Sequence, residues 1–348
     1  MISPETLKKQ VDLASLSTMA TPARARYFLA ATTVEQALAG LELAATEQWP
    51  LLILGGGSNL VFCDDFQGLV LHMAIRGRRW TAVDEQGATL VLAAGENWHD
   101  AVLYAARAGY RGIENLALIP GTAGAAPVQN IGAYGMELAD TLVSVKVWDR
   151  ELQQERLLKP EDCQFGYRDS LFKQQPGRYL ILEIRLRLSR RGEYRTGYGE
   201  LAQWFGGVQP RSPLEVTEAV MALRRRKLPD PQQLPNAGSF FKNPVVSEAV
   251  WQGLRQEWPD MVAFPAEDEQ VKLAAGWLIE RCGWKGYKNQ TVGVHHKQAL
   301  VLVNHSGGTG KEVMALASRI REEVHGTFGV TLEVEPGIVP EHCGLPPL

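Results

Sequence analysis

One long segment, residues 119–135, constrains the fold of this chain more than any other feature. It reads IPGTAGAAPVQNIGAYG, so it is rich in small residues, interrupted by two prolines and free of charged side chains. Such a segment cannot be a helix or a strand throughout, yet it is too apolar for an ordinary solvent-exposed loop. We therefore expect its backbone to pack against something flat and large.

A second glycine-rich segment points to a phosphate group. The apolar run 51–54 is followed by Gly55, Gly56, Gly57, Ser58 and Asn59, and then by Leu60. Glycines leave the backbone N–H groups open to a diphosphate, although a plain tight turn would use the same residues. Because the chain continues apolar and extended at 60–62, a Rossmann dinucleotide site is not supported. Together, the two segments fit a flavin with its diphosphate.

The bulk properties exclude several classes of protein. A chain of 348 residues with 45% hydrophobic content can bury a large core and favours two or three domains. Its net charge of −3 gives no field that would hold nucleic acid. There is no signal-peptide pattern or membrane-spanning run, so we expect a cytoplasmic protein. The four cysteines are scattered and lack metal-ligand spacing, which favours reduced, structural cysteines and no metal site.

Local patterns predict an α+β order of elements. Thr32 and Glu35 form a capping-box pattern before a four-turn helix, and Ser212 with Glu215 caps another helix that ends at Lys227. Residues 228–235 contain three prolines and are the candidate domain boundary. Strands are expected at 51–54, 69–71, 90–94, 142–148, 181–188 and 299–303, and further helices at 97–109, at 271–281 and after Thr309.

The ordered motifs resemble those of a known family, the UDP-N-acetylenolpyruvoylglucosamine reductases, in their longer form. The resemblance starts with GGGSN and the segment 119–135, and it covers almost the whole chain. The further motifs, in order, are FGYRDSLFK at 165–173, GYGEL at 197–201, KLPDP at 227–231, NAGSFFKNP at 236–244 and HKQALVLVN at 296–304. A chance match to all of them in this order is very improbable.

The resemblance implies a fold class and a cofactor site. The fold is α+β: an FAD-binding domain of the vanillyl-alcohol-oxidase type, in two subdomains, followed by a substrate-binding domain. The expected division is 1–65 with 330–348, then 66–228, then 229–329. FAD is expected to bind noncovalently, with NADPH as co-substrate. The implied cofactor residues are Gly55, Gly56, Gly57, Ser58, Asn59, Leu60, Gly121, Thr122, Gly124, Ile131, Gly132, Ala133 and Tyr134.

Three residues are implied to be catalytic in the reduction of an enol ether conjugated to a carboxylate. Arg168 can grip the carboxylate, and Ser239 is the family's proton donor. Taken alone, an Arg beside Asp169 is more often a surface ion pair, and a Ser after a glycine is more often a turn residue. Glu335 is the third residue, and Glu333 is the alternative because both lie on one face of a strand. Pro336 follows where relatives continue the strand, which leaves that continuation open.

The remaining expectations concern the partners of the protein. The implied substrate residues are Tyr167, Tyr198, Lys227, Asn243 and Gln298. The implied reaction converts UDP-N-acetylglucosamine enolpyruvate to UDP-N-acetylmuramate for peptidoglycan synthesis. We expect a monomer that binds this UDP-sugar and NADPH but neither nucleic acid nor membrane. Two other readings stay open: a flavin oxidase or dehydrogenase with the same binding fold, and a non-catalytic nucleotide-binding protein.

Overall fold

The computed structural model describes residues 2–266 and 269–346 of the chain. These residues form two compact units, each assembled from separate stretches of sequence. Unit 1 consists of the residues up to Val11, Ala25–Gly56 and Gln67–Arg226. Unit 2 consists of Asp12–Arg24, Gly57–Phe66 and the chain from Lys227 onward. The three-domain division given above stays a prediction.

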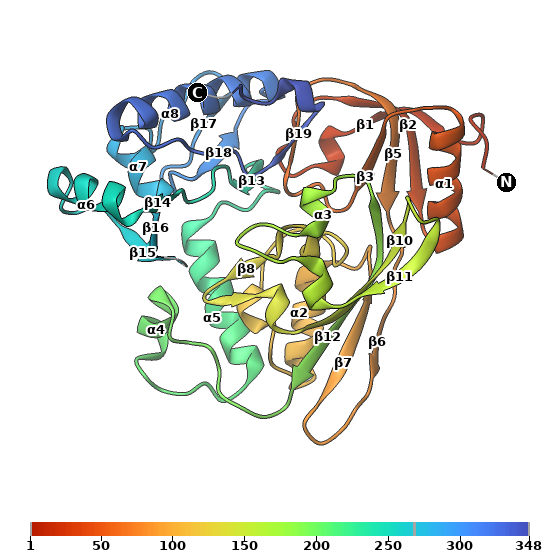
Figure 1. Ribbon diagram of the computed structural model, residues 1–348, viewed down its shortest axis with the longest axis horizontal. Coiled ribbons are helices and arrows are strands. Elements are labelled where there is room, and N and C mark those ends of the chain that lie inside the picture. Colours follow the sequence, from red (N-terminus) through yellow and green to blue (C-terminus); the bar gives the residue numbers. More distant parts are fainter. Residues whose placement is uncertain (1, 267–268, 347–348) are drawn as a thin grey trace. The chain divides into compact units, whose positions relative to one another are not determined.

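A four-stranded sheet and one helix form the first part of unit 1 (Figure 1). The predicted strand at 51–54 is confirmed, and it runs parallel to the longer strand that contains residues 69–71. The helix packs Ala37 and Leu41 against Leu71 of this sheet. In spatial order the strands are β1 (Lys8–Asp12), β2 (Arg24–Ala31), β5 (Phe66–Met73) and β3 (Leu51–Leu54), and the helix is α1 (Val34–Thr46).

The cap of α1 lies one residue later than the sequence pattern predicted. Thr33, not Thr32, is the N-cap, and its hydroxyl accepts a hydrogen bond from the Gln36 N–H at 3.3 Å. The Gln36 side chain in turn accepts from the Thr32 N–H at 2.9 Å. Two adjacent threonines can both start a helix, and the reach of the Gln36 amide decides between them. The predicted helix itself is confirmed.

A five-stranded antiparallel sheet forms the second part of unit 1. The predicted alternation at 181–188 is confirmed, because Ile184, Leu186 and Leu188 are fully buried while the residues between them reach solvent. The predicted strands at 90–94 and 142–148 lie in the same sheet. In spatial order the strands are β11 (Gln154–Leu158), β10 (Leu142–Asp149), β12 (Tyr179–Ser189), β7 (Gly87–Ala93) and β6 (Arg78–Thr81).

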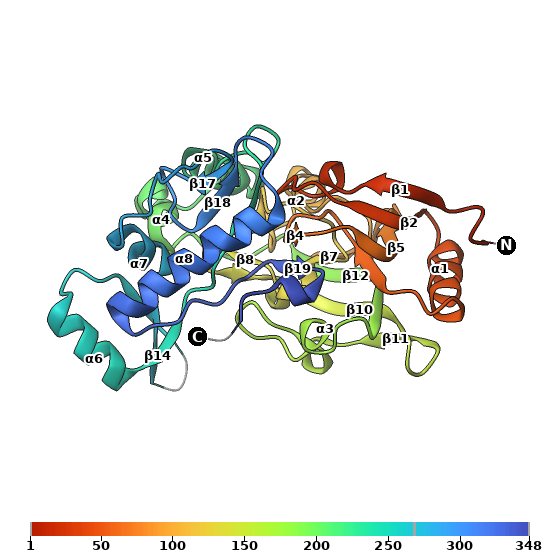
Figure 2. The same cartoon turned by 90° about the horizontal axis from the view of Figure 1, so that it is seen from above.

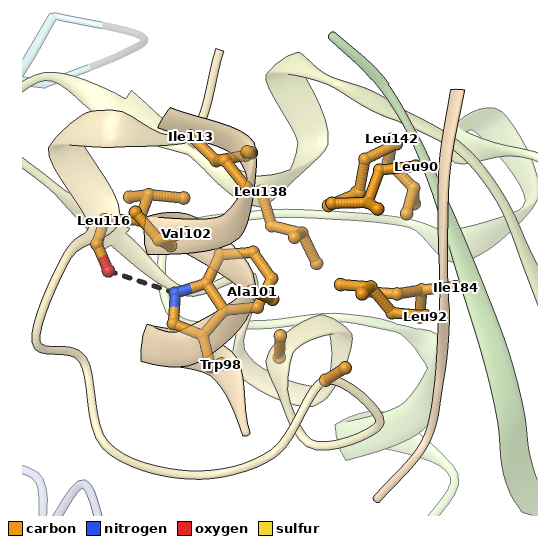
Figure 3. Packing of buried hydrophobic residues seen from close by; sticks show 14 of the residues in the cluster. Leu90, Leu92, Trp98, Ala101, Val102, Ile113, Leu116, Leu138, Leu142 and Ile184 are labelled. Carbon is orange, nitrogen blue, oxygen red and sulfur yellow. Dashed lines mark hydrogen bonds between the residues drawn. The ribbon is translucent and has the colours of Figure 1, made fainter. Parts of the chain in front are cut away.

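Two helices share a core with this sheet. The buried side of α2 (Trp98–Arg107) and of α5 (Pro213–Lys227) belongs to the same apolar cluster as the inward residues of β7 and β12. Figure 3 shows Trp98 at the centre of this packing, where its indole N–H donates to the Leu116 carbonyl at 3.0 Å. The predicted cap of α5 is confirmed, since the Ser212 hydroxyl accepts from the Glu215 N–H at 3.2 Å.

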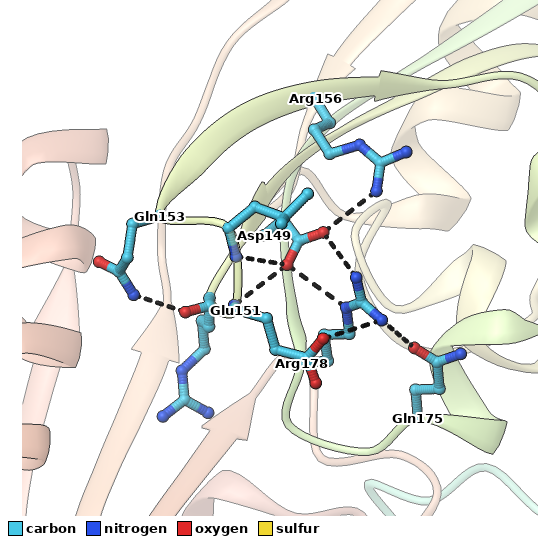
Figure 4. Close-up of polar contacts among 8 residues, drawn as sticks. Asp149, Glu151, Gln153, Arg156, Gln175 and Arg178 are labelled. Carbon is cyan, nitrogen blue, oxygen red and sulfur yellow. Dashed lines mark hydrogen bonds and ion pairs between the residues drawn. The ribbon is translucent and has the colours of Figure 1, made fainter.

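One buried carboxylate ties the end of β10 to its surroundings (Figure 4). Asp149 is inaccessible to solvent and pairs with both Arg156 and Arg178 at 3.1 Å. Burial alone would raise its pKa, but the hydrogen bonds from Arg178, from Arg156 and from the backbone N–H groups of Glu151 and Leu152 lower it to about 2. The ion cluster therefore holds the β10–β11 hairpin and the start of β12 in one arrangement.

Unit 2 contains two three-stranded antiparallel sheets with helices around a common core. Figure 2 shows α8 running beside α7, and the predicted capping box of Thr309 and Glu312 at the start of α8 is confirmed. The first sheet is β13 (Asn236–Ser239), β18 (Val301–Asn304) and β17 (Val292–Val294), and the second is β14 (Val245–Ser247), β16 (Gln270–Leu273) and β15 (Ala263–Pro265). The helices are α6 (Glu248–Glu257), α7 (Ala275–Arg281) and α8 (Gly310–Phe328).

The predicted helix at 271–281 was wrong in its first turn. Residues 270–273 form β16, and the helix begins only at Ala275. Val271 and Leu273 are buried while Gln270 is exposed, which is the period of a strand. Over four residues this period resembles the start of a helical stripe, so the sequence did not separate the two. The predicted strand at 299–303 is confirmed as β18, with its start two residues later.

The remaining elements are short. In unit 1 they are β8 (Gly132–Ala133), β9 (Met136–Glu137), α3 (Leu171–Gln174) and α4 (Gly199–Phe205). In unit 2, β4 (Leu60–Phe62) pairs in parallel with β19 (Gly337–Val339). As predicted, the proline-rich stretch 228–235 contains no helix or strand.

Candidate functional site

The two glycine-rich segments lie against each other in unit 1. A Cβ atom on Gly55 would lie 2.7 Å from the Thr122 hydroxyl oxygen, and one on Gly56 would lie 2.8 Å from the Gly121 Cα. Neither gap admits a side chain, so both positions need glycine. The structure therefore brings together four residues that the sequence assigned to the cofactor, although their role stays a prediction.

The segment after Gly121 is anchored by its backbone. The Ala123 N–H donates to the Glu96 carbonyl, and the Gly124 N–H donates to the Ala94 carbonyl, both at 2.8 Å. A Cβ on Gly124 would lie 2.6 Å from the Cβ of Ala94. As predicted, the segment is not one regular element: a 3-10 turn at 126–129 leads into the β8–β9 hairpin. Its path is therefore fixed by close backbone approach.

The polar groups of the two glycine-rich segments suit a phosphate-bearing cofactor. The Thr122 hydroxyl oxygen is buried and has no hydrogen-bond partner among the described residues. The backbone of Gly55 runs directly beside this hydroxyl, since a Cβ on Gly55 would lie 2.7 Å from the Thr122 oxygen, and Gly56 continues the same glycine run. Buried donors without acceptors are rare, and successive glycine N–H groups form anion sites. The residues present therefore suit a diphosphate such as that of FAD.

Arg168 lies at the tip of a tight turn that contacts the hairpin. Gly166 and Asp169 exchange backbone hydrogen bonds at 3.1 and 3.2 Å, which leaves Tyr167 and Arg168 at the tip. Arg168 has a φ of 55°, a left-handed conformation that is uncommon for a residue with a side chain. Its guanidinium donates to the Gly132 carbonyl at 3.0 Å. The turn thus places a fixed cation at a predicted cofactor residue.

Sequence reasoning missed one arginine of the same unit. Arg224 of α5 donates to the Leu118 carbonyl at 3.3 Å, while its Nε atom is buried without a partner in the described chain. Burial lowers the pKa of Arg224, and the nearby Tyr134 partly offsets the effect. The sequence predicted that the basic run 224–227 suits a doubly charged UDP group and that two of its four residues face solvent, without indicating which two. The position of Arg224 one turn after the buried Val220 is the signal that could have identified it.

Tyr198 and Tyr134 lie near each other. Tyr134 and Gly135 form the turn of the β8–β9 hairpin, with φ values of 50° and 76°. A Cβ on Gly135 would lie 3.4 Å from the Cβ of Tyr198, whose residue is 52% exposed at the start of α4. Burial raises the pKa of Tyr134. The predicted substrate tyrosine therefore packs on the hairpin while keeping an exposed face.

In unit 2, Ser239 ends strand β13. It pairs with Val301 of β18, and the φ of 73° at Gly238 turns the chain just before it. Phe240 and Phe241 are buried in the core of unit 2, with ring centroids 5.5 Å apart. These two rings fix the strand end, so the half-buried serine hydroxyl has a defined place.

The two candidate glutamates have different surroundings. Glu333 pairs with Lys242 at 2.7 Å, and its side chain is 71% exposed. Glu335 is half-buried, and its N–H donates to the Phe240 carbonyl at 2.9 Å, next to Ser239 in sequence. The surface pair of Glu333 favours Glu335 as the reacting carboxyl. The role of Glu335 stays a prediction.

At Pro336 the chain changes its strand partner, so the strand does not continue with the same neighbour beyond Glu335. Before it, Glu333 and Glu335 exchange backbone bonds with 240–242. After it, the Gly337 N–H donates to the Asn59 carbonyl at 2.9 Å, and β19 pairs with β4. A proline fits this position because no N–H is needed there. The Asn59 amide also donates to the Glu335 carbonyl at 3.4 Å, so a predicted cofactor residue touches the segment of a predicted catalytic one.

Of the other predicted residues of unit 2, Asn243 and Gln298 lie close together, whereas Ser58 and Lys227 lie elsewhere. Asn243 accepts from the Ala275 N–H at 3.0 Å, and the Gln298 amide oxygen lies 3.1 Å from where a Cβ on Gly276 would be. Both amides therefore lie at the first turn of α7. Ser58 accepts a hydrogen bond from Thr18 at 3.3 Å through its carbonyl, whereas Lys227 is exposed at the end of α5.

Neither a metal site nor a membrane span is found in the described part of the chain. Across residues 2–266 and 269–346, no group of three or more His, Cys, Asp or Glu side chains could hold a metal ion. None of the helices described is long and apolar enough to cross a membrane.

Comparison with known proteins gives the class and then the family. A family model described as an FAD binding domain matches residues 25–152, which contain the glycine loop and the segment 119–135. The fold and this match define a flavoprotein of the FAD-dependent oxidoreductase class. A second model, the C-terminal domain of UDP-N-acetylenolpyruvoylglucosamine reductase, matches residues 230–339.

Whole-chain relatives agree with both models. Reductases of this name from Pseudomonas aeruginosa and Chromobacterium violaceum are each 47% identical over 95% of this chain and 98% of their own length. The crystal structure of the reductase from Thermus caldophilus matches with a TM-score of 0.65 at 25% identity, covering 95% of this chain and 98% of that one. The chain belongs to the UDP-N-acetylenolpyruvoylglucosamine reductase family.

Proposed function

We propose that this protein reduces UDP-N-acetylglucosamine enolpyruvate to UDP-N-acetylmuramate with NADPH, as a step of peptidoglycan precursor synthesis. The observation that carries the proposal is the 47% identity to named reductases over 95% of the chain. The glycine segments, which leave donors suited to a diphosphate, support it. FAD, when bound, supplies hydride transfer from NADPH to the substrate.

The backbone of unit 1 holds the cofactor in this proposal. We assign the N–H groups of Gly55 and Gly56, and the partnerless Thr122 hydroxyl beside them, to the diphosphate. The other predicted cofactor residues of this unit all belong to the segment 119–135. They are Gly121, Gly124, Ile131, Gly132, Ala133 and Tyr134. Gly57, Ser58, Asn59 and Leu60 continue the loop in unit 2. No covalent link is proposed.

Arg168 binds the substrate carboxylate. Hydride addition to the methylene carbon leaves an enolate-like charge on the neighbouring carbon and its carboxylate. A guanidinium that is already held by the Gly132 carbonyl meets this charge without reorganising, and such preorganised charge stabilises a transition state more than its ground state.

Ser239 donates the proton that completes the reduction. A serine hydroxyl is a poor acid, so a nearby cation must lower the cost of its alkoxide, and we assign that role to Lys227. Glu335 acts as a second polar group at the developing charge. The fixed strand end formed by Phe240 and Phe241 keeps the hydroxyl in one orientation.

The remaining assignments concern substrate binding and the oligomeric state of the protein. Tyr167 and Tyr198 contact the substrate from unit 1, while Asn243 and Gln298 use their amide N–H groups from unit 2, since their oxygens face α7. The protein acts as a cytoplasmic monomer. Light scattering on the purified, FAD-loaded protein gives the oligomeric state directly.

An anaerobic stopped-flow experiment tests the reaction. The bound flavin is reduced with NADPH, the UDP-enolpyruvate is then added, and absorbance near 450 nm is followed. Return of the oxidised spectrum, with one UDP-N-acetylmuramate formed per flavin, is the expected result. Flavin that stays reduced until oxygen is admitted would contradict the proposal and point to an oxidase.

A further inference from the structure

Two of the four cysteines lie together at the chain end of unit 2. Cys63 directly follows β4, and its N–H donates to the Val339 carbonyl of β19 at 2.7 Å. The chain then turns through a 3-10 helix at 341–343, which ends at Cys343. This turn keeps Cys343 beside Pro340, since the Cys343 N–H donates to the Pro340 carbonyl at 3.1 Å, and Cys343 packs against the same core cluster that contains Cys63. Both cysteines are free, Cys63 buried and Cys343 half-buried.

The start of α8 packs on the residues around Cys63. The N-terminal end of α8 lies against Cys63, since a Cβ on Gly310 would lie 2.7 Å from the Cys63 Cα. Lys311, in the first turn of α8, pairs with Asp64 at 3.1 Å. These contacts fix the backbone of residues 62–64, so Cys63 is held in place next to the segment 339–343. Figure 2 shows this end of α8 beside β4.

We propose that Cys63 and Cys343 form a reversible disulfide that fastens the C-terminal segment to β4. The sulfur of the more accessible Cys343 attacks one oxygen of hydrogen peroxide and the O–O bond breaks. The leaving hydroxide takes the Cys343 thiol proton and becomes water, which leaves a sulfenic acid on Cys343. The Cys63 sulfur then displaces hydroxide from the sulfenic sulfur, and the Cys63 proton converts that hydroxide to water. Two thiols lose two electrons and two protons, and one hydrogen peroxide becomes two waters.

The division of labour between the two cysteines follows from burial. Burial, together with the Cys343 thiol, raises the pKa of Cys63 to about 12, so Cys63 is a poor first nucleophile. Cys343 is the accessible partner, and Cys63 is held beside it to resolve the sulfenic acid. The segment fastened by this bond includes β19, which follows Glu335 and Pro336. The modification does not depend on the proposed reductase activity.

The test uses the full-length, FAD-loaded protein treated with hydrogen peroxide. Thiol titration after denaturation should fall from four to two, and peptide mass spectrometry should find the Cys63–Cys343 link. Dithiothreitol should restore all four thiols. Cys343→Ser should show no crosslink, whereas Cys282→Ser should still lose two thiols. Cys282 is the matched control because it is also half-buried but contacts Thr327 instead.

Stability gives an independent measurement. Oxidation should raise the unfolding midpoint of the wild type and of Cys282→Ser by about 5 °C, because the bond constrains a long loop of the unfolded chain. Cys343→Ser should not shift. Four thiols remaining after peroxide treatment, a link between other cysteines, or overoxidation of Cys343 without the crosslink would each overturn the proposal.

Discussion

The two units each carry predicted site residues, and the two sets differ in kind. In unit 1 the backbone defines the site: Gly55, Gly56 and Gly124 each approach a neighbour too closely for a side chain. In unit 2 side chains define it, and Ser239 and Glu335 lie at the ends of short strand pairings. Backbone N–H groups that bind a ligand remain when a side chain is substituted. A reacting side chain, by contrast, is removed by one substitution, and its chemistry is lost with it. We therefore expect unit 1 substitutions to alter binding and unit 2 substitutions to alter rates.

The largest effect is expected for Ser239→Ala. Loss of the proton donor should slow reoxidation of the flavin by the UDP-enolpyruvate roughly 10³-fold, about 4 kcal/mol in the barrier. Reduction of the flavin by NADPH and the flavin content should stay unchanged. The two half-reactions are measured separately by stopped flow. If both slowed equally, Ser239 would hold the cofactor, and the contrast between the units would fail.

A framework substitution in unit 1 should come next. Asp149→Asn leaves Arg156 and Arg178 without their buried partner and should lower the free energy of unfolding by about 3 kcal/mol at pH 7. Because the folded pKa of Asp149 lies below its unfolded value, its contribution is complete above about pH 5 and is lost as the pH falls through 4 towards 2.

Urea unfolding at a series of pH values checks this second prediction. The difference between wild type and Asp149→Asn should narrow below pH 4. The exposed pair of Arg187 with Asp84 supplies the matched control, and Asp84→Asn should change the free energy of unfolding much less than Asp149→Asn does, because solvent screens the pair. An equal loss in both variants would mean that burial of Asp149 contributes nothing.

The two glutamates of the last strand pairing test the unit 2 side of the comparison. Glu335→Gln should lower kcat roughly 100-fold, or about 2.7 kcal/mol, while Glu333→Gln should leave kcat within a factor of two. The reason is that Glu333 is occupied at the surface by Lys242. Steady-state kinetics at saturating substrate measures both variants. The opposite order would place Glu333 in the site.

The smallest effect is expected for Gly56→Ala. The added methyl group lies 2.8 Å from the Gly121 Cα, so the two segments must separate, and we expect FAD affinity to drop about tenfold, or 1.4 kcal/mol. Flavin fluorescence titration of the apoprotein measures it. Gly253→Ala is the control, because nothing lies within 4 Å of its Cβ position in α6. Unchanged affinity in Gly56→Ala would remove the backbone argument for unit 1.

Elements with signals inside one short window could be predicted from sequence. β3 ends at a glycine, α5 carries its cap and stripe within fifteen residues, and α8 begins with a complete capping box. The start of α7 could not be predicted, because two apolar residues two apart fit both a strand and a helix over so short a run. The cap of α1 failed for a similar reason, with two threonines competing for one position.

The arrangement of the candidate site residues could be predicted where motifs exist, but not where burial of a single side chain decides it. The glycine loop and segment 119–135 were identified as partners, and the structure packs them together. Arg224 was missed because a run of four basic residues gives no sign of which one turns inward. The change of partner at Pro336 could not be derived either, since it depends on strands far away in sequence.

The pairing of β4 with β19 has a consequence for how the chain is made. The Asn59 amide and the Glu335 carbonyl are 276 residues apart in sequence, yet they share a hydrogen bond. During synthesis at the ribosome, β4 emerges early and must wait for almost the entire remaining chain before its neighbour exists. Unit 2 can therefore complete its fold only after residues 337–339 have been synthesised, whereas the sheets of unit 1 can assemble earlier, while the polypeptide is still growing.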